Sequence, residues 1–405
     1  MGVIKSLKAR FGSGREEGAD SDQGLADNVQ RAFTYGDVDD RWGAIRAVGE
    51  LGSPFVAPLI RALQDEYWII RRGAANTLGK IGAPAVGPLI EALEQENEDV
   101  RQEIFRALAL IGPPSHGMLI HAVSHEQVLI RRGAIEALGV MCVEEAVPAI
   151  VSALKDPDPR VRQEGAVALQ SICNPTAVPA LIELLRDGQG YVRMSATNAL
   201  RTLGMPSIGP LIEALGDSNR DFSRAAALGL VTIGLPAVDP LIESLSSDLP
   251  GIRRGSAEVL GLIGNQKAIV PLIGLLNDPE RSVRREAVDG LANLGAPAVT
   301  QLMAAFHDGD PMVRNSAMEA IWIIGTPATP LLIEMLTDKN PDVRKRAALL
   351  LGEIADRRAV DALARMLMDE NTAVRREAFE ALEMIKKRTG RQNEDRGETP
   401  KRNVR

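Results

Sequence analysis

The sequence predicts an all-α fold: a right-handed α-α superhelix (α-solenoid) of about twelve two-helix repeats. Three observations support this prediction. An arginine returns every 30 or 31 residues, apolar residues follow it with helical spacing, and no segment shows the alternation typical of strands. A single helix pair cannot bury its apolar face alone, so we expect neighbouring repeats to form one continuous core.

The repeated arginine marks the second helix of each unit, which we call helix B. Counted from this anchor, a small residue lies at position +3, Leu at +7 and Ile or Leu at +10, on one helical face. Helix A is the shorter apolar stretch before it, as in residues 88–93. The anchors are Arg41, Arg71, Arg101, Arg131, Arg162, Arg193, Arg253, Arg284, Arg314, Arg344 and Arg375, with Ser223 in the seventh unit.

Two kinds of linker set the step length. Steps of 30 residues contain Gly-x-Pro, as at Gly82, where Gly ends one helix and Pro begins the next. The four steps of 31 residues use another linker, so we expect the Gly-x-Pro corner to save one residue. Cys142 and Cys173 take the glycine position in two of the longer linkers. That position predicts packing rather than nucleophilic chemistry.

An aspartate precedes the anchor by six residues in eight of the twelve units. At a corner between helices, its carboxylate can accept from backbone N–H groups and from a guanidinium group next door. The eight are Asp65, Asp156, Asp187, Asp217, Asp278, Asp308, Asp338 and Asp369.

The pattern D-x-x-x-x-V-R-x-x-A-x-x-A-L-G-x-I-G resembles the short HEAT-like repeats associated with phycobilisome lyase subunits. The resemblance covers roughly residues 24–386. It implies that the aspartates form a structural ladder between adjacent units with the anchors, among them Arg71, Arg162, Arg193, Arg284, Arg314, Arg344 and Arg375. Because Ser223 breaks this pattern next to Asp217, we expect a softer joint at residues 217–230.

The ends of the chain differ from the array in composition. We expect a flexible segment at 1–23, a capping repeat at 24–53 and repeats to residue 386. A disordered charged tail is expected at 387–405. Asp40, at a position where other units carry Val or Ile, suggests a polar outer face for the capping repeat.

The resemblance implies that helix B lines a concave surface, and we expect positions +1, +2, +5 and +9 to be exposed there. Basic and aromatic residues on this face predict binding of a protein or an acidic peptide. They are Arg72, Arg132, Arg224, Arg254, Arg285, Lys345 and Arg376, with Trp42 and Trp322. The alternative is a solvated face on which acidic residues at +5 neutralise the basic residues at +1.

These patterns favour a non-catalytic scaffold or adaptor without cofactor, metal or catalytic residues. The alternative is an enzyme or enzyme subunit related to phycobilin lyases or to deoxyhypusine-hydroxylase-like oxidoreductases. The latter resemblance would require several His-Glu pairs, and the sequence has only His125-Glu126.

Net charge, hydropathy and cysteine content limit the kinds of partner and the cellular location that we expect. A formal charge of −7 argues against nucleic acid as a partner. The sequence contains no apolar run of the roughly 18 residues that a membrane span needs. Two cysteines make no disulfide framework. We therefore expect a cytoplasmic protein, and a monomer.

Overall fold

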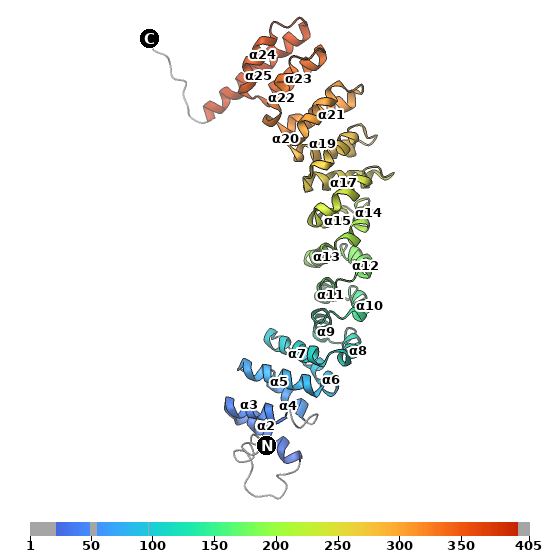
Figure 1. Ribbon diagram of the computed structural model, residues 1–405, viewed down its shortest axis with the longest axis vertical. Coiled ribbons are helices and arrows are strands. Elements are labelled where there is room, and N and C mark those ends of the chain that lie inside the picture. The colour runs from blue at the N-terminus through green and yellow to red at the C-terminus, as the bar shows by residue number, and fades with distance from the viewer. Residues whose placement is uncertain (1–21, 49–54, 96, 396–405) are drawn as a thin grey trace, which may run out of the picture. The chain divides into compact units, whose positions relative to one another are not determined.

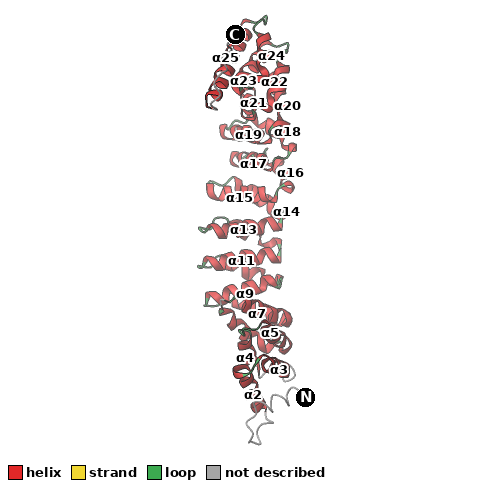
Figure 2. Ribbon diagram, turned by 90° about the vertical axis from the view of Figure 1, so that its left-hand side faces the viewer, coloured by secondary structure: helices red, strands yellow, loops and turns green. Residues whose placement is uncertain are grey.

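The computed structural model describes residues 22–48, 55–95 and 97–395. It divides into two compact units, Met1–Leu203 and Gly204–Arg405, which we describe one at a time. Within the described residues every regular element is a helix, and none is a strand (Figure 2).

The helices alternate between a helix A and a helix B throughout. In the first unit they are α2 (Asp22–Tyr35), α3 (Val38–Val48), α4 (Val56–Ala62), α5 (Trp68–Ile81), α6 (Val86–Glu91), α7 (Glu98–Ile111), α8 (His116–Ala122), α9 (Val128–Val140), α10 (Val147–Ala153), α11 (Pro159–Ile172), α12 (Val178–Leu184) and α13 (Gly190–Leu203). In the second unit they are α14 (Met205–Leu215), α15 (Arg220–Ile233), α16 (Val238–Ser244), α17 (Pro250–Ile263), α18 (Ile269–Gly274), α19 (Arg281–Leu294), α20 (Ala296–Ala304), α21 (Pro311–Ile324), α22 (Thr329–Met335), α23 (Pro341–Ile354), α24 (Val360–Met366) and α25 (Thr372–Asp395).

Each unit is an α-solenoid of helix pairs stacked in chain order. In the first unit the B helices α5, α7, α9, α11 and α13 follow one another, with the A helices beside them (Figure 1). The second unit repeats this arrangement from α15 to α25. The predicted fold class is therefore confirmed.

The structure corrects two details at the ends. Helix α25 continues to Asp395, so the charged tail expected from residue 387 begins as helix. Asp40 does not form a polar outer face. Its side chain is buried at the start of α3, where it exchanges hydrogen bonds of 2.9 and 3.1 Å with Asp37. Most of the segment expected to be flexible, 1–23, lies outside the described residues.

The two linker types differ in backbone conformation, which explains their lengths. At the 30-residue steps, glycines such as Gly82 have φ of 79° and ψ of −139°, a region open only to glycine. At the 31-residue steps, the corner residue is left-handed, as in Cys173 with φ of 56° and ψ of 38°. An additional extended residue follows it: the Asn174 side chain caps the next turn through the N–H of Thr176.

Neighbouring B helices approach closely because small residues line their contact. A Cβ atom added to Gly261 would lie 2.5 Å from the Cα of Gly290 in the next repeat. In the first unit the same position, Gly139, faces Ala168 at 2.8 Å. The stacking distance between repeats therefore depends on small residues at these two positions.

At four junctions the anchoring arginine joins one repeat to the next through a forked contact. Arg253 donates from Nη1 to the carbonyl oxygen of Ser247 in its own repeat at 2.8 Å. Its Nε and Nη2 reach both carboxylate oxygens of Asp278 in the following repeat, at 2.7 and 2.9 Å. Asp278 also accepts from the N–H of Glu280 at 2.9 Å. The same forked contact joins Arg131 to Asp156, Arg162 to Asp187, and Arg344 to Asp369.

Hydrogen bonding lowers the pKa of the carboxyl groups of Asp278 and Asp369. Burial alone would raise the pKa of Asp278, but the Arg253 guanidinium and the Glu280 N–H outweigh it and hold this pKa below its usual range. The guanidinium of Arg344 likewise lowers the pKa of Asp369. The aspartates therefore stay ionised and paired at neutral pH.

The forked contact is confined to the four 31-residue steps, and the ladder varies at the other junctions, even where the expected aspartate is present. Arg41 lies 3.3 Å from Asp65, whereas Arg71 reaches Asp99 at 3.0 Å. Asp338 is hydrogen bonded to His307 at 3.0 Å. Four further anchors donate to carbonyl oxygens of the turn before their own helix B: Arg193, Arg284, Arg314 and Arg375.

Ser223 alters the ladder differently from what we expected. The forked pairs join an arginine to the aspartate of the following repeat, so the carboxylate that an arginine at position 223 would bind belongs to position 247, and this residue is Ser247. Ser223 instead donates its hydroxyl to the carbonyl oxygen of Leu215 at 3.0 Å. Both members of one ladder pair are therefore replaced by serine, and Asp217 is not the residue affected.

We expect Asp278→Ala to lower the free energy of unfolding by about 2–4 kcal/mol, because Arg253 would keep its buried charge without the carboxylate. Urea denaturation followed by circular dichroism measures this loss. Asp239→Ala is the matched control, since Asp239 pairs at 3.1 Å with Lys267 and both are exposed. That change should cost less than about 1 kcal/mol. Equal losses in both variants would show that the ladder does not stabilise the array.

Restoring the missing ladder pair should tighten the joint between α15 and α17. We expect Ser223→Arg combined with Ser247→Asp to be more stable than the sum of the single changes by about 1 kcal/mol. Amide hydrogen exchange at residues 217–230 should also slow in the double variant. Additive effects, with unchanged exchange, would mean that this joint is not limited by its missing ion pair.

Candidate protein-binding surface

The exposed surface of the B helices, formed by positions +1, +5 and +9, is the helix-B face. Residues at these positions are exposed or half-buried in both units, as expected. Position +2 is different, because the preceding repeat packs against it. A Cβ atom added to Gly73 would lie 2.4 Å from the ring of Trp42, and one on Gly133 would lie 2.9 Å from Leu93. The glycines at +2 therefore serve packing and are not open to a partner.

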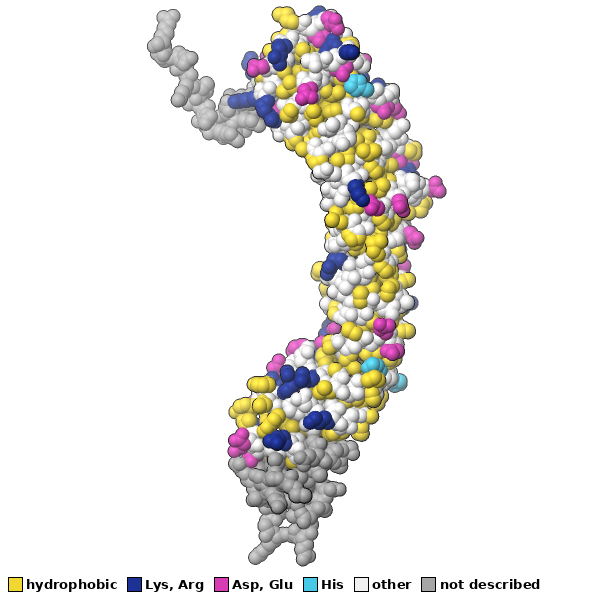
Figure 3. Space-filling model, viewed as in Figure 1, with side chains coloured by type: hydrophobic (Ala, Val, Ile, Leu, Met, Phe, Trp, Pro, Cys, Tyr) yellow, Lys and Arg dark blue, Asp and Glu magenta, His cyan; other side chains and the backbone are white. Residues whose placement is uncertain are grey.

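In the first unit, aliphatic side chains form a line across three consecutive B helices. Leu110 on α7 is 54% exposed and Val140 on α9 is 58% exposed. Val167 on α11 is also exposed, one helical turn earlier, at position +5. The first two border a cavity of about 460 Å³ that is also lined by Phe105 and Arg106. Among the N-terminal helices of this unit, basic and apolar side chains lie next to each other on the surface (Figure 3).

The second unit carries a similar set of apolar residues on its helix-B face. Leu228 on α15 and Leu262 on α17 are exposed at +5 and +9. On α21, Trp322 is 48% exposed beside the exposed Ile323. A surface helix normally presents polar residues at such positions, so these side chains are candidates for contact with a partner.

The basic residues of this face are largely paired within the chain. Arg72 donates from Nε to both carboxylate oxygens of Glu103 in the next repeat, at 2.8 and 3.0 Å. Nη2 of Arg132 lies 3.8 Å from Oε2 of Glu164, a longer contact between the corresponding positions. In each case, position +1 of one repeat meets the glutamate at +2 of the next. These contacts form a second, incomplete ladder on the helix-B face.

The second unit contains the same combination twice. Arg254 stands beside Glu286 and Lys345 beside Glu377, and the attraction of each cation partly offsets the effect of burial on the neighbouring carboxyl group. Arg285 and Arg376 instead pair with acidic residues one turn along their own helix: Asp289 at 3.9 Å and Glu380 at 3.5 Å. Arg224 is exposed on α15.

Burial dominates the titration of these glutamates despite the nearby cations. It raises the pKa of Glu164 to about 7, assisted by the negative charge of Glu136. Burial also raises the pKa of Glu286 to about 7, with Glu258 and Asp289 contributing. The pKa of Glu136 and that of Glu377 are raised for the same reason.

Sequence reasoning missed the four glutamates at +2: Glu103, Glu164, Glu286 and Glu377. A signal for them was present. Repeats that begin helix B with Arg-Arg-Gly at 71, 131 and 253 are each followed by a repeat with Glu at +2. The glycine at +2 leaves space for the preceding repeat. The arginine at +1 of the same repeat then contacts the glutamate at +2 of the following repeat.

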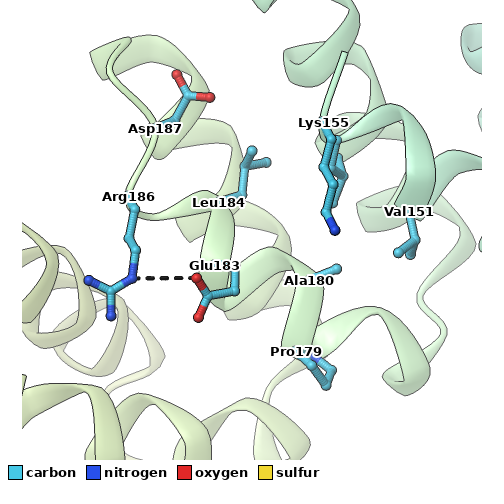
Figure 4. Close-up of a pocket in the computed structure, with 9 residues that line it drawn as sticks. Val151, Lys155, Pro179, Ala180, Glu183, Leu184, Arg186 and Asp187 are labelled. Carbon is cyan, nitrogen blue, oxygen red and sulfur yellow. Dashed lines mark ion pairs between the residues drawn. The ribbon is translucent and has the colours of Figure 1, made fainter. Parts of the chain in front are cut away.

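A second cavity lies on the helix-A side of the first unit and was not expected from the sequence. It measures about 490 Å³ between α10 and α12 (Figure 4). Val151, Pro179 and Ala180 supply apolar walls, and Lys155 lies at one side. Glu183 is bound to Arg186 at 3.4 Å. The charged groups around this cavity pair with one another or face solvent. The cavity therefore lacks the convergent polar groups typical of an active site.

The residues raised as possible metal ligands are scattered. His125 lies in the turn before α9, where its Nδ1 accepts from the N–H of Gln127 at 3.1 Å. Cys142 and Cys173 are both exposed, with left-handed backbones at successive corners. Within the part of the chain that the structure describes, no three His, Cys, Asp or Glu side chains are grouped to hold a metal ion.

A helix must be both long and apolar to cross a bilayer. Among the helices described, no single one is long and apolar enough to do so.

The raised pKa of Glu164 makes stability depend on pH. Below the unfolded pKa of about 4.3, the carboxyl group is protonated in both states. Between there and about pH 7 only the folded state keeps the proton, so its contribution to stability is lost as pH rises. Glu164→Gln should therefore be more stable than the wild type at pH 8 by roughly 1–2 kcal/mol and similar to it at pH 4.

Urea denaturation of both proteins across this pH range checks the expectation. Glu183→Gln is the control, because Glu183 is exposed on α12. A difference between Glu164→Gln and the wild type that is constant across the range would contradict a buried, proton-binding Glu164.

Comparison with solved structures finds several matches of low sequence identity. An engineered protein, Northeast Structural Genomics Consortium target OR497, is 20% identical and has a TM-score of 0.30; the match covers 95% of this chain and 99% of that one. Kap121p is 14% identical with a TM-score of 0.39; 96% of this chain and 52% of Kap121p are covered. Human deoxyhypusine hydroxylase in complex with glycerol is 23% identical with a TM-score of 0.25; 60% of this chain and 96% of the enzyme are covered.

The chain thus spans about half the length of Kap121p. At these identities the likeness concerns the fold alone, and no curated protein matches the chain. A sequence profile for HEAT repeats matches residues 25–109, 86–147, 117–201, 208–283, 269–339 and 329–393. Together the matches span most of the sequence, and the chain therefore belongs to the HEAT-repeat family.

Proposed function

We propose that this protein is a non-catalytic scaffold whose helix-B face binds a partner protein. The observation that carries the proposal is the line of exposed aliphatic side chains on α7, α9 and α11: Leu110, Val140 and Val167. Exposed apolar residues on consecutive repeats are typical of a surface that another chain covers. In this proposal the short repeats, of the type associated with phycobilisome lyase subunits, position the helix-B face and take no part in catalysis.

The spacing of the repeats suggests the form of the partner. Packed helices lie about 8–10 Å apart, and an extended chain advances about 3.3 Å per residue. A partner segment in extended conformation would therefore present one apolar side chain to each repeat about every three residues. Arg106, which lines the first-unit cavity together with Leu110 and Val140, favours an acidic residue next to those apolar anchors.

The pairing of Arg72 with Glu103 limits the role of the arginine row. A partner would have to displace or share the carboxylate that already binds this guanidinium, which costs free energy of desolvation. We therefore assign the main contribution to the aliphatic line and a steering role to the exposed arginines. Charged residues at the edge of an interface mainly affect association rate and specificity.

Affinity capture with paired variants tests this function. We expect the triple change Leu110→Asp, Val140→Asp and Val167→Asp to abolish capture of the main partner from native lysate, because each aspartate would be buried against an apolar anchor. The control carries Met118→Asp, an equally exposed apolar residue on helix α8. Circular dichroism should show both variants to be as helical as the wild type.

Two results would contradict the proposal. The first is retention of the same partner by the triple variant. The second is stoichiometric metal or a visible chromophore in the purified protein, which would favour an enzyme over a scaffold.

A further inference from the structure

The first three B helices of the first unit, α3, α5 and α7, expose cations on the helix-B face. Arg46 and Arg106 are at position +5 of their helices and Lys80 is at +9, and all three are exposed. Arg106 donates from Nε to Oδ1 of Asn76, the +5 residue of α5, at 3.0 Å. Positions +5 of neighbouring B helices therefore lie side by side. We call Arg46, Lys80 and Arg106 the basic half of this face.

The cations of the basic half are open to a partner. Among the described residues, none of the three takes part in an ion pair. Arg72 on the same face differs, because it already binds both carboxylate oxygens of Glu103. Glu136, at +5 on α9, is half-buried and lies 3.6 Å from Nε of Arg101. A carboxylate from a partner can thus bind the basic half without displacing one that belongs to the chain.

An apolar half follows the basic half without a break. Its members are exposed aliphatic residues on α7, α9 and α11: Leu110, Val140 and Val167. A Cβ atom added to Gly79, next to Lys80, would lie 2.5 Å from the Cβ of Leu110, so α5 and α7 touch where the two halves meet. Helices α9 and α11 touch in the same way at Gly139 and Ala168. One continuous strip therefore changes from basic to apolar at α7.

The spacing of the repeats sets the length of chain that can cover this strip. Packed helices lie about 8–10 Å apart, and an extended chain advances about 3.3 Å per residue. Four steps separate α3 from α11, so an extended segment that covers both halves needs roughly 10–12 residues. The order of the two halves along the array then dictates the order of residues along that segment.

We propose that the helix-B face of the first unit binds one extended protein segment with acidic residues grouped at one end and large apolar residues grouped at the other. The acidic end binds the basic half, and the apolar end covers the apolar half. This inference rests on the protein-binding role proposed above and adds the composition and order of the residues that are bound. A nucleic acid, which is charged along its whole length, would leave the apolar half uncovered.

Selection from a random peptide-display library tests the proposal on the purified full-length chain. With peptides of about 16 residues, longer than the strip requires, the enriched sequences should carry Asp or Glu in one half and Leu, Ile, Phe or Trp in the other. Within each half these residues should recur about every three positions. An enriched peptide is then synthesised with a fluorescent label, and its Kd is measured by anisotropy.

Reversal of charge in the basic half tests the acidic end of the segment. Arg46→Glu combined with Lys80→Glu should raise the Kd of the enriched peptide by about tenfold or more, because like charges then face each other. A second peptide, with Lys in place of each acidic residue, should bind this variant more tightly than it binds the wild type. This exchange of preference requires direct contact between the peptide and the basic half.

The matched control changes the net charge by the same amount elsewhere in the first unit. Arg61 on α4 and Lys155 after α10 are both exposed on the helix-A side. Arg61→Glu combined with Lys155→Glu should leave the Kd of both peptides unchanged. Circular dichroism should show that both double variants are as helical as the wild type.

Three results would overturn the inference. They are enrichment of no peptide or of peptides that mix acidic and apolar residues throughout, a Kd that charge reversal in the basic half leaves unchanged, and single-stranded DNA that binds as tightly as the enriched peptide. The protein-binding role is judged separately, by loss of partner capture when Leu110, Val140 and Val167 are changed together. It stands if that capture is lost while the order of charged and apolar residues proves wrong.

Discussion

The forked contact between an anchoring arginine and the aspartate of the following repeat is the interaction on which the array depends. Arg253 binds carbonyl oxygens of its own turn and the carboxylate of Asp278 at the same time. One planar group therefore sets the conformation of a turn and its distance from the next turn. Because both partners are mostly buried, loss of one leaves the charge of the other buried without its partner. At one junction both positions are serine, Ser223 and Ser247.

Much of the fold could be predicted from spacing alone, because every helix pair solves the same packing problem as its neighbours. The twelve pairs, their corners and the exposure of +1, +5 and +9 all follow from one repeated pattern. Exceptions depend on geometry between repeats, which a single unit does not contain. Arg71 binds Asp99, and Asp338 binds His307, because those side chains reach the ladder from neighbouring positions.

The candidate binding face was harder to predict because its charges interact across repeats. Arg72 and Glu103 are 31 residues apart, so neither helix considered alone shows their contact. Position +2 was expected to be exposed, and it is covered because the preceding repeat leans over it. Burial then raises the pKa of Glu164 even though Arg132 is near. The exposed aliphatic residues were predicted more successfully, since exposure at +5 and +9 depends on helix geometry within one repeat.

The two corner conformations have a consequence for how such a chain can change in length. A Gly-x-Pro corner and a left-handed corner such as Cys173 connect helices of the same kind, yet they differ by one residue. A single-residue insertion or deletion at a corner can therefore be absorbed by exchanging one conformation for the other. The same change within a helix would rotate its apolar side away from the core. Corners are thus the natural sites for recombination between arrays, and whole repeats can be added or removed there without altering the units on either side.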